Sequence, residues 1–190
     1  MAPKLDRRKQ YTRMVLKDSL MKLLKEKHIS KITVKEICEL ADINRSTFYS
    51  HYSDQYEFLN KIEEEIIEDM NKTLSTYNDA KEEEALQMTE KILEYIAANK
   101  DIFQTLLSEH SDTSFQKRAM ETTHQFTMKN WMDVNNLDPK ISEYISMFVV
   151  SGSIHAIKSW LDNGMDKSPK DLAEIINNFT NKGLSSWLRA

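Results

Sequence analysis

Glycine and proline are scarce in this sequence of 190 residues, which contains only three of each. Sharp chain reversals need residues with special backbone angles, so this scarcity argues against β-sandwiches, barrels and propellers. The chain also lacks the glycine-rich phosphate-binding patterns GxGxxG and GxxxxGK. Hydrophobic residues make up 40% of the chain, which is enough to form a packed core. We therefore expect an all-α fold.

Cysteine and long apolar runs are also lacking. The single cysteine, Cys38, excludes an internal disulfide and any CxxC pair, and its helical spacing from Ala41 fits a buried apolar position. The apolar run Met147–Val150 falls short of the roughly 18 residues that a membrane-spanning helix needs. No apolar stretch follows the N-terminal charges, so we expect no secretion signal and a cytoplasmic protein.

Charge is distributed unevenly along the chain. The formal net charge is −4, yet residues 1–35 carry eleven Lys and Arg against three acidic residues. Residues 1–60 sum to +4, which leaves −8 for residues 61–190. A basic end on an acidic body attracts polyanions locally, but a lysine-rich helix face exposed to water has the same composition. Charge alone leaves these two interpretations even.

The N-terminal part of the chain shows the pattern of three helices. Leucines recur on one face of residues 10–27, with Lys and Arg opposite, as in an amphipathic helix. Thr33 and Glu36 have the spacing of a capping box, which opens a short second helix. Asp42-Ile43-Asn44 interrupts that helix, because Asp and Asn tolerate positive φ, and Asn44 can cap a third helix from Arg45 to His51. Two short helices braced by a longer one form a helix-turn-helix layout.

The third expected helix turns a polar face outward. Phe48 and Tyr52, four residues apart, face inward. The residues left facing out are Arg45, Ser46, Thr47, Tyr49, Ser50 and His51. Such side chains donate hydrogen bonds to base edges and phosphates, and none is acidic, whereas a helix that merely faced water would be rich in Glu and Lys. This composition favours DNA binding, which charge alone left open.

The stretch from Thr33 to Tyr52 reads TVKEICELADINRSTFYSHY. It resembles the DNA-binding domain of the TetR (tetracycline repressor) family of transcriptional regulators at almost every fixed position of the family's pattern. Asp42 departs from it, because the family usually has Gly there. The resemblance implies an all-α homodimer with a three-helix DNA-binding head, residues 1–53, and a helical effector-binding and dimerisation body, residues 54–190.

The same resemblance implies roles for individual residues. Arg45, Thr47 and His51 would approach bases or nearby phosphates, and Tyr49 would hold the DNA backbone. Thr33, at the N-terminus of its helix, would add a phosphate contact through its hydroxyl and amide. A looser resemblance, carried by residues 152–165, points to the subgroup that includes the DhaS-type regulators.

The last two helices expected in the body form a strongly apolar pair. Pairing with the same helices of a second chain would bury their apolar stripes in a four-helix bundle, although both stripes could instead pack on the chain's own body. A dimer suits DNA recognition, because a single recognition helix reads too few bases. The residues expected at the dimer interface are Met147, Val150, Ile154, Ile157, Leu161, Leu172, Ile175, Ile176 and Phe179.

An effector pocket is only weakly marked. Residues that could line an apolar cavity with a few polar handles are Phe103, Met120, His124, Phe126, Met128, Trp131, Tyr144 and Phe148. No HxxxH or Cys/His pair supports a metal site at the histidines, so no metal or cofactor is expected. Glu121 and His124 are three residues apart but have no nucleophile beside them, so we expect no enzymatic activity.

Together these patterns predict a sequence-specific, DNA-binding transcriptional regulator, namely a ligand-responsive repressor that binds a palindromic operator as a homodimer. Its partners would be double-stranded DNA, a second copy of the chain and a small-molecule effector. The alternative is a protein-interaction co-activator, in which the acidic surface of a TetR-like body docks another protein. Whether a small molecule or a protein partner changes the affinity for DNA discriminates between the two.

Overall fold

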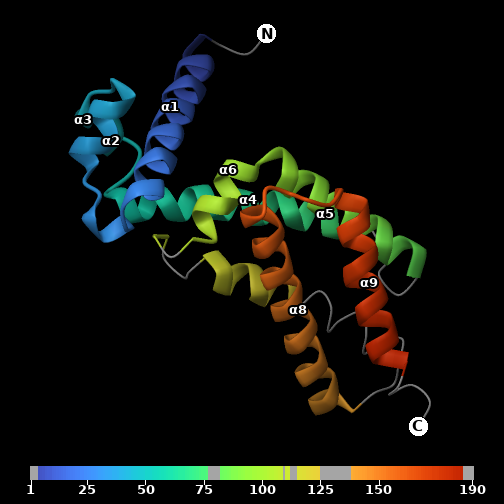
Figure 1. Cartoon of the computed structure of the whole chain (residues 1–190). Coiled ribbons are helices and arrows are strands. Elements are labelled where there is room, and N and C mark those ends of the chain that lie inside the picture. The colour runs from blue at the N-terminus through green and yellow to red at the C-terminus, as the bar shows by residue number, and fades with distance from the viewer. Residues whose placement is uncertain (1–3, 77–81, 109, 112–114, 125–137, 186–190) are drawn as a thin grey trace. The chain divides into compact units, whose positions relative to one another are not determined.

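The chain folds into helices throughout the part that the structure describes. The computed structural model describes residues 4–76, 82–108, 110–111, 115–124 and 138–185. The helices are α1 (Lys4–Glu26), the 3₁₀ helix η1 (Ile29–Lys31), α2 (Val34–Ala41), α3 (Arg45–Tyr49), α4 (Gln55–Leu74), α5 (Glu82–Ala98), α6 (Lys100–Leu106), α8 (Pro139–Asp162) and α9 (Pro169–Ser185) (Figure 1). Residues 115–124 are also helical. The predicted all-α fold is confirmed, and none of the described helices is long and apolar enough to cross a membrane.

Contacts divide the chain into two compact units, each built from two separate stretches of sequence. The first unit comprises Met1–Ile66 and Thr105–Phe115. The second comprises Ile67–Gln104 and Gln116–Ala190. These units do not coincide with the division after residue 53 that the sequence suggested.

Aromatic packing explains why the first unit extends into α4. Phe48 of α3 and Phe58 of α4 are both fully buried, with their ring centroids 5.6 Å apart in an edge-to-face arrangement. Tyr52 completes the cluster, with ring centroids 5.4 Å from Phe48 and 4.5 Å from Phe58. Edge-to-face aromatic pairs add stabilisation beyond the apolar area they bury. The first turns of α4 therefore belong to the core that holds α3.

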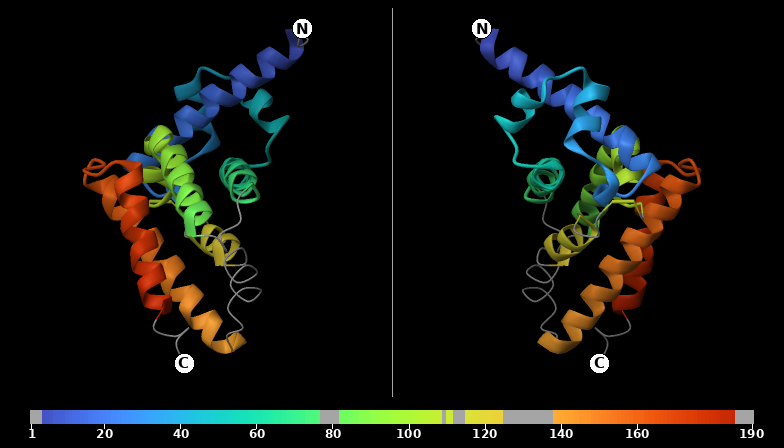
Figure 2. Two further views of the ribbon diagram at one scale, coloured as in Figure 1. Left: turned by 90° about the vertical axis from the view of Figure 1, so that its right-hand side faces the viewer. Right: turned by 90° about the vertical axis from the view of Figure 1, so that its left-hand side faces the viewer.

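The long helix α1 supplies the other wall of the first unit. Leu16, Leu20 and Leu24 recur every four residues and are buried, as the amphipathic pattern predicted. The second helix, α2, packs against α1, and α3 follows after a short turn (Figures 1 and 2). The predicted helix-turn-helix layout is therefore present.

A distant stretch of sequence completes the first unit. The Ile29 amide, at the start of η1, donates a hydrogen bond to the His110 carbonyl at 3.2 Å. Leu106, Leu107 and Phe115 flank this contact in sequence and are all buried. Described residues that follow α6 thus belong to the same unit as the helix-turn-helix, although the two stretches are far apart in the sequence.

In the second unit, α5 packs against α9, and α8 and α9 lie side by side in both views of Figure 2. Asp138 caps α8, and Pro139 occupies its first turn, as predicted. The chain leaves α8 through Gly164, whose φ of +77° is in the region that favours glycine. The Trp160 indole N–H then donates to the Lys167 carbonyl at 2.8 Å and fixes the connection to α9.

We expect Leu106→Ala to destabilise the protein by about 2–5 kcal/mol, because it leaves a cavity at a fully buried position. It should also speed hydrogen exchange at the Ile29 amide, whose acceptor lies in the same stretch. Leu40→Ala, at a half-exposed position of the same unit, is the matched control and should change stability by about 0.5 kcal/mol or less. Chemical denaturation and exchange detected by NMR measure both effects, and equal losses in the two variants would contradict the assignment.

Candidate nucleic-acid interface

The turn between α2 and α3 is fixed by backbone geometry and by one side-chain cap. Asp42 adopts the left-handed conformation, with φ 53° and ψ 44°, directly after α2. The Ile43 amide donates to the Cys38 carbonyl at 2.9 Å. Asn44 then caps α3, because its Oδ1 accepts from the Ser46 amide at 2.9 Å. The predicted turn and cap are both present, and an Asp serves where the TetR pattern usually has Gly.

The third helix is shorter than the sequence suggested. It ends at Tyr49 rather than at His51, and Ser50 forms its C-terminal cap. The Ser50 hydroxyl donates to the Thr47 carbonyl at 2.7 Å, which satisfies one of the last carbonyls of the helix. His51 and Tyr52 nevertheless continue the same turn, since their amides both donate to the Phe48 carbonyl.

Most of the predicted DNA-contacting side chains are exposed. Arg45, Ser46, Tyr49, Ser50 and His51 are exposed, while Thr47 is half-buried beside the buried Phe48. The large Tyr49 side chain is 57% exposed although its ring packs edge-on against Phe48, so its hydroxyl is held outward. The structure therefore brings these residues onto one surface, as predicted.

Hydrogen bonding separates these residues into two groups. The hydroxyls of Ser46 and Ser50 donate within the chain, to Asn44 Oδ1 and the Thr47 carbonyl respectively. Arg45, Thr47, Tyr49 and His51 have no side-chain hydrogen bond or ion pair to the residues that the structure describes. These four keep their donors available for an incoming partner.

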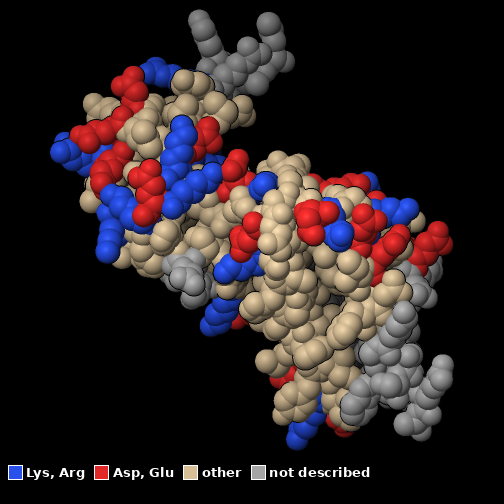
Figure 3. Space-filling model, viewed as in Figure 1, with Lys and Arg blue, Asp and Glu red and all other residues tan. Residues whose placement is uncertain are grey.

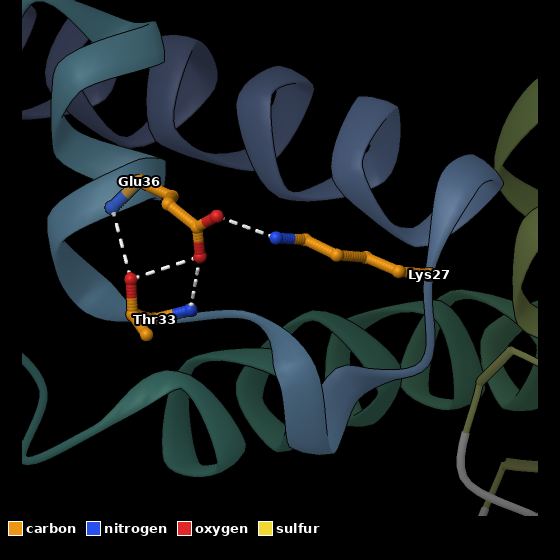
Figure 4. A network of polar contacts seen from close by, with 3 residues as sticks. All are labelled: Lys27, Thr33 and Glu36. Atoms are coloured by element: carbon orange, nitrogen blue, oxygen red, sulfur yellow. Dashed lines mark hydrogen bonds and ion pairs between the residues drawn. The ribbon is translucent and has the colours of Figure 1, made fainter.

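A polar network ties the end of α1 to the start of α2 (Figure 4). Glu36 Oε2 accepts from both the amide and the hydroxyl of Thr33 at 2.9 Å, and the Glu36 amide donates back to the Thr33 hydroxyl at 3.3 Å. The Lys27 ammonium reaches Glu36 Oε1 at 2.5 Å. The bond from Lys27, followed by those from Thr33, lowers the pKa of the Glu36 carboxyl from 4.5 to about 2.

This network changes the role that the resemblance gave to Thr33. Its amide and hydroxyl, expected to contact a phosphate, both donate to the Glu36 carboxylate. A phosphate would have to replace that carboxylate and approach its negative charge. Thr33 therefore acts as the N-terminal cap of α2, and the phosphate contact through these two groups is corrected.

The basic N-terminal segment does not present charge of one sign. Arg13 of α1 pairs with Glu65 of α4, and Lys35 lies 3.7 Å from Glu39 within α2. Figure 3 shows Lys and Arg interspersed with Asp and Glu over the helix-turn-helix on this face. Part of the positive charge of residues 1–35 is thus neutralised by ion pairs with nearby carboxylates.

The structure separates the residues predicted to line an effector pocket. Phe103 is buried, and Met120 and His124 are half-buried. Tyr144 and Phe148 are 73% and 67% exposed, so their placement in an interior pocket is wrong. Each of them follows a buried serine, Ser142 or Ser146, by two residues. Two residues correspond to a rotation of about 200° around a helix, so Tyr144 and Phe148 lie on the opposite side of α8 from these serines. Phe126, Met128 and Trp131 lie outside the described residues.

The residues predicted at a dimer interface also divide by exposure. Val150, Leu161 and Leu172 are buried within their own chain, so they are not available to a second chain and are corrected to core positions. Ile154, Ile157 and Ile176 are half-buried. Met147, Ile175 and Phe179 are at least half-exposed.

Two residues missing from the predicted interface, Tyr144 and Phe148, lie with the exposed group. Phe148 stacks on Phe179 of α9, with ring centroids 6.5 Å apart, although both rings are more than 60% exposed. The signal that could have found them is the i, i+4 series Tyr144, Phe148, Gly152, which defines one face of α8. Apolar residues on both faces of this helix obscured it.

The described residues contain no group of three His, Cys, Asp or Glu side chains placed to hold a metal ion. Two of the histidines form polar contacts with serine residues. His155 Nδ1 contacts the Ser151 carbonyl at 2.8 Å, and His124 Nδ1 contacts the Ser146 hydroxyl at 2.8 Å.

A family model described as a transcriptional regulator C-terminal region, TetR_C_8, matches residues 83–182, more than half of the chain. The chain belongs to the TetR family of transcriptional regulators. Members of this family are DNA-binding regulators rather than enzymes. The matched residues 83–182 lie mostly in the second unit, and residues 105–115 among them belong to the first. The resemblance noted in the sequence lies in α2 and α3. Two separate parts of the chain therefore point to the same TetR family.

One relative is similar to part of this chain. YxbF of Bacillus subtilis (strain 168), an uncharacterized HTH-type transcriptional regulator, is 39% identical over 59 residues. That stretch is 31% of this chain but only 14% of YxbF, so the chain spans a small part of that relative.

Solved structures extend the likeness to the whole fold. A TetR transcriptional regulator from Streptococcus agalactiae is 24% identical, with a TM-score of 0.67 over 92% of this chain and 96% of that one. The dihydroxyacetone kinase operon activator DhaS is 18% identical, with a TM-score of 0.59 over 92% and 96%. Both likenesses are in fold, and the one to DhaS does not establish the DhaS-like subgroup.

We expect Glu36→Gln to lower the melting temperature at neutral pH, because it removes the charge that Lys27 and Thr33 stabilise. The folded-state pKa lies below the unfolded value, so this stabilisation is complete above pH 4.5 and is lost as the pH falls towards about 2. The difference between wild type and variant should therefore be constant down to pH 4.5 and shrink below it.

Thermal unfolding followed by circular dichroism from about pH 7 to about pH 3 measures this difference. Glu39→Gln, on the same helix and in an exposed pair with Lys35, is the control and should show little change at any pH. A gap between wild type and Glu36→Gln that is as large at about pH 3 as at about pH 7 would contradict the role of the carboxylate.

Proposed function

We propose that this TetR-family regulator is a ligand-responsive repressor that binds a palindromic operator as a homodimer in the cytoplasm. The observation that carries the proposal is the outer surface of α3, where Arg45, Thr47, Tyr49 and His51 have no polar partner among the described residues. These side chains are mounted on a helix whose two ends are capped. A positioned set of free donors is what a base-reading helix needs.

The chemistry of each side chain suggests its target. The guanidinium of Arg45 suits paired acceptors on guanine or a phosphate, and the His51 ring suits either. Thr47 is half-buried and reaches less far, so it would contact a base edge or a thymine methyl group close to the helix. Tyr49, held by Phe48, would donate to a backbone phosphate and fix the register of α3.

Repression follows from occupancy. A regulator that is bound at a promoter blocks the binding of RNA polymerase without any further contact. An effector would then act by favouring a dimer in which the two recognition helices no longer fit half-sites about 34 Å apart. It must bind one arrangement more tightly than the other by several kcal/mol, roughly 5 for a near-complete switch.

We expect Thr47→Ala or Tyr49→Ala to weaken specific DNA binding at least tenfold while leaving the fold intact, because each removes a free donor from the surface of α3. The assay incubates full-length protein with sheared host genomic DNA at about 150 mM salt and sequences the retained fragments. Wild type should retain a sharp set of fragments that share a palindrome.

Thr89→Ala is the matched control, since Thr89 lies on α5 and its hydroxyl donates to the Ala85 carbonyl one turn away. It should retain the same fragments as wild type. Uniform retention by wild type, or unchanged selection by both α3 variants with a native circular dichroism spectrum, would contradict the assignment of the interface.

The second part of the proposal is the dimer. The exposed side chains Tyr144, Met147 and Phe148 of α8 join Ile175 and Phe179 of α9 into one apolar face, across which the two phenylalanine rings stack. The surface over α8 is largely uncharged in Figure 3. Monomeric proteins rarely expose an apolar patch of this extent, and two helices per chain would form a four-helix interface about a two-fold axis.

Gly152 supports a close approach at this face. It lies on the same side of α8 as Phe148, is exposed, and has no atom within 4 Å of where a Cβ would be. A glycine within a helix costs about 1 kcal/mol relative to alanine unless something else requires it. Contact with the backbone of a second copy supplies a reason for its presence.

We expect Phe148→Glu or Phe179→Glu to convert the protein to a monomer, because each places a charge at the centre of the apolar face. Size-exclusion chromatography with light scattering should show the molar mass of wild type falling by half. Tyr11→Glu, which is 60% exposed on α1, is the control and should leave the mass unchanged. A monomeric wild type, or a dimer in both Phe variants, would rule out this interface.

A further inference from the structure

The inner face of α8 carries two buried serines where a core helix would be expected to carry apolar residues. Ser142 and Ser146 are one turn apart and both are 0% exposed. Val150 and Trp160, further along the same inner face, are buried and apolar. Burying a hydroxyl is unfavourable unless it forms a hydrogen bond, so each serine needs a partner.

Only one of the two serines has a partner among the described residues. The Ser146 hydroxyl lies 2.8 Å from His124 Nδ1, on the helical segment at residues 115–124. Ser142 Oγ is buried and has no hydrogen-bond partner in the described part of the chain. It does not donate to the Asp138 carbonyl either, although that carbonyl, one turn earlier and bonded to the Ser142 amide, is the usual acceptor for a serine within a helix.

The surroundings restrict what could satisfy this hydroxyl. Ser142 and Ser146 are the buried polar side chains of the second unit within the described residues, and no carboxylate is buried there. A bound cation would therefore find no carboxylate to pair with among those residues, whereas donated hydrogen bonds can stabilise a carboxylate as well as a carbonyl. The hydroxyls and the imidazole ring can all donate, which matches an oxygen acceptor on the ligand.

We propose that Ser142, with Ser146 and His124 beside it, is the polar contact of the effector site, and that the effector presents a carbonyl or carboxylate oxygen to the Ser142 hydroxyl. This inference rests on the proposed function, in which a small molecule controls DNA binding. Val150, about two helical turns further along the same inner face, is buried and apolar and would contact the remainder of such a molecule.

The position of the contact connects ligand binding to the DNA-binding unit. His124 ends a described helical segment that begins at Phe115, and Phe115 belongs to the first unit. In the sequence, this segment follows the stretch of the first unit that contains His110, whose carbonyl accepts from the Ile29 amide. The same chain segment thus carries both the ligand contact and a part of the helix-turn-helix unit.

The test uses three probes that share a six-carbon tail and differ in the polar group: hexanoate, 2-hexanone and hexylammonium. Each is added at about 10 mM to the full-length protein, and the melting temperature is measured with and without the operator fragment selected from genomic DNA. Hexanoate, 2-hexanone or both should raise the melting temperature of the free protein by about 2–6 °C and release the operator. Hexylammonium should do neither.

Ser142→Ala separates a ligand contact from a structural role. Because the hydroxyl has no partner, its removal should leave the melting temperature of the ligand-free protein unchanged or raise it. The rise in melting temperature that hexanoate or 2-hexanone causes should fall at least tenfold. Ser146→Ala should instead lower that temperature, because it leaves His124 without its partner. Ser159→Ala, exposed on the outer side of α8, is the matched control and should respond as wild type does.

The outcomes distinguish failure of the site from failure of the proposed function. A Ser142→Ala protein that melts several degrees lower without ligand has lost a structural contact, which overturns the inference. So does a wild type that responds to hexylammonium, or to none of the probes. If wild type selects its operator and Ser142→Ala responds normally, the site is wrong while the regulator stands. If wild type selects no operator, the proposed function itself fails.

Discussion

A helix of five residues cannot hold its own shape, and the proposed DNA-reading surface of this protein is such a helix. Its geometry is imposed from outside, by the Asn44 cap at one end, the Ser50 cap at the other and the Phe48 ring packed against Phe58 between them. The left-handed Asp42 sets the angle at which the chain enters the helix. Every side chain proposed to contact DNA depends on these four restraints, so the geometry of α3 is determined by packing in the rest of the first unit.

Local features of this fold could be predicted from the sequence, whereas features that depend on distant contacts could not. The Thr33–Glu36 capping box and the Asn44 cap each involve residues two or three apart, and both are present as expected. The sequence could not show that the Thr33 amide and hydroxyl both donate to the Glu36 carboxylate, because Lys27, which follows another helix, holds that carboxylate in place. Likewise, no local pattern indicates that His110 accepts from Ile29.

The two faces of α8 show a second limit of prediction from the sequence. A helix that is apolar on one side reveals its buried face by periodicity, but α8 has apolar residues on both sides and serines on its inner one. Tyr144 and Phe148 were therefore assigned inward and Val150 and Leu161 outward, the reverse of what the structure has. The ambiguity has a functional cause, since one face of α8 is proposed to meet a second chain and the other a ligand. A helix that contacts a second chain on one face and a ligand on the other departs from the usual pattern of one apolar and one polar face.

The two-segment construction of the first unit also has a consequence for synthesis on the ribosome. The helix-turn-helix emerges early, but the carbonyl that accepts from Ile29 and the buried side chains of Leu106, Leu107 and Phe115 emerge only after α4, α5 and α6. Nascent chains fold as their contacts become available. The first unit is thus completed only once Ile67–Gln104, the first part of the second unit, has been made, so a prematurely terminated product that ends before residue 105 lacks a finished helix-turn-helix unit.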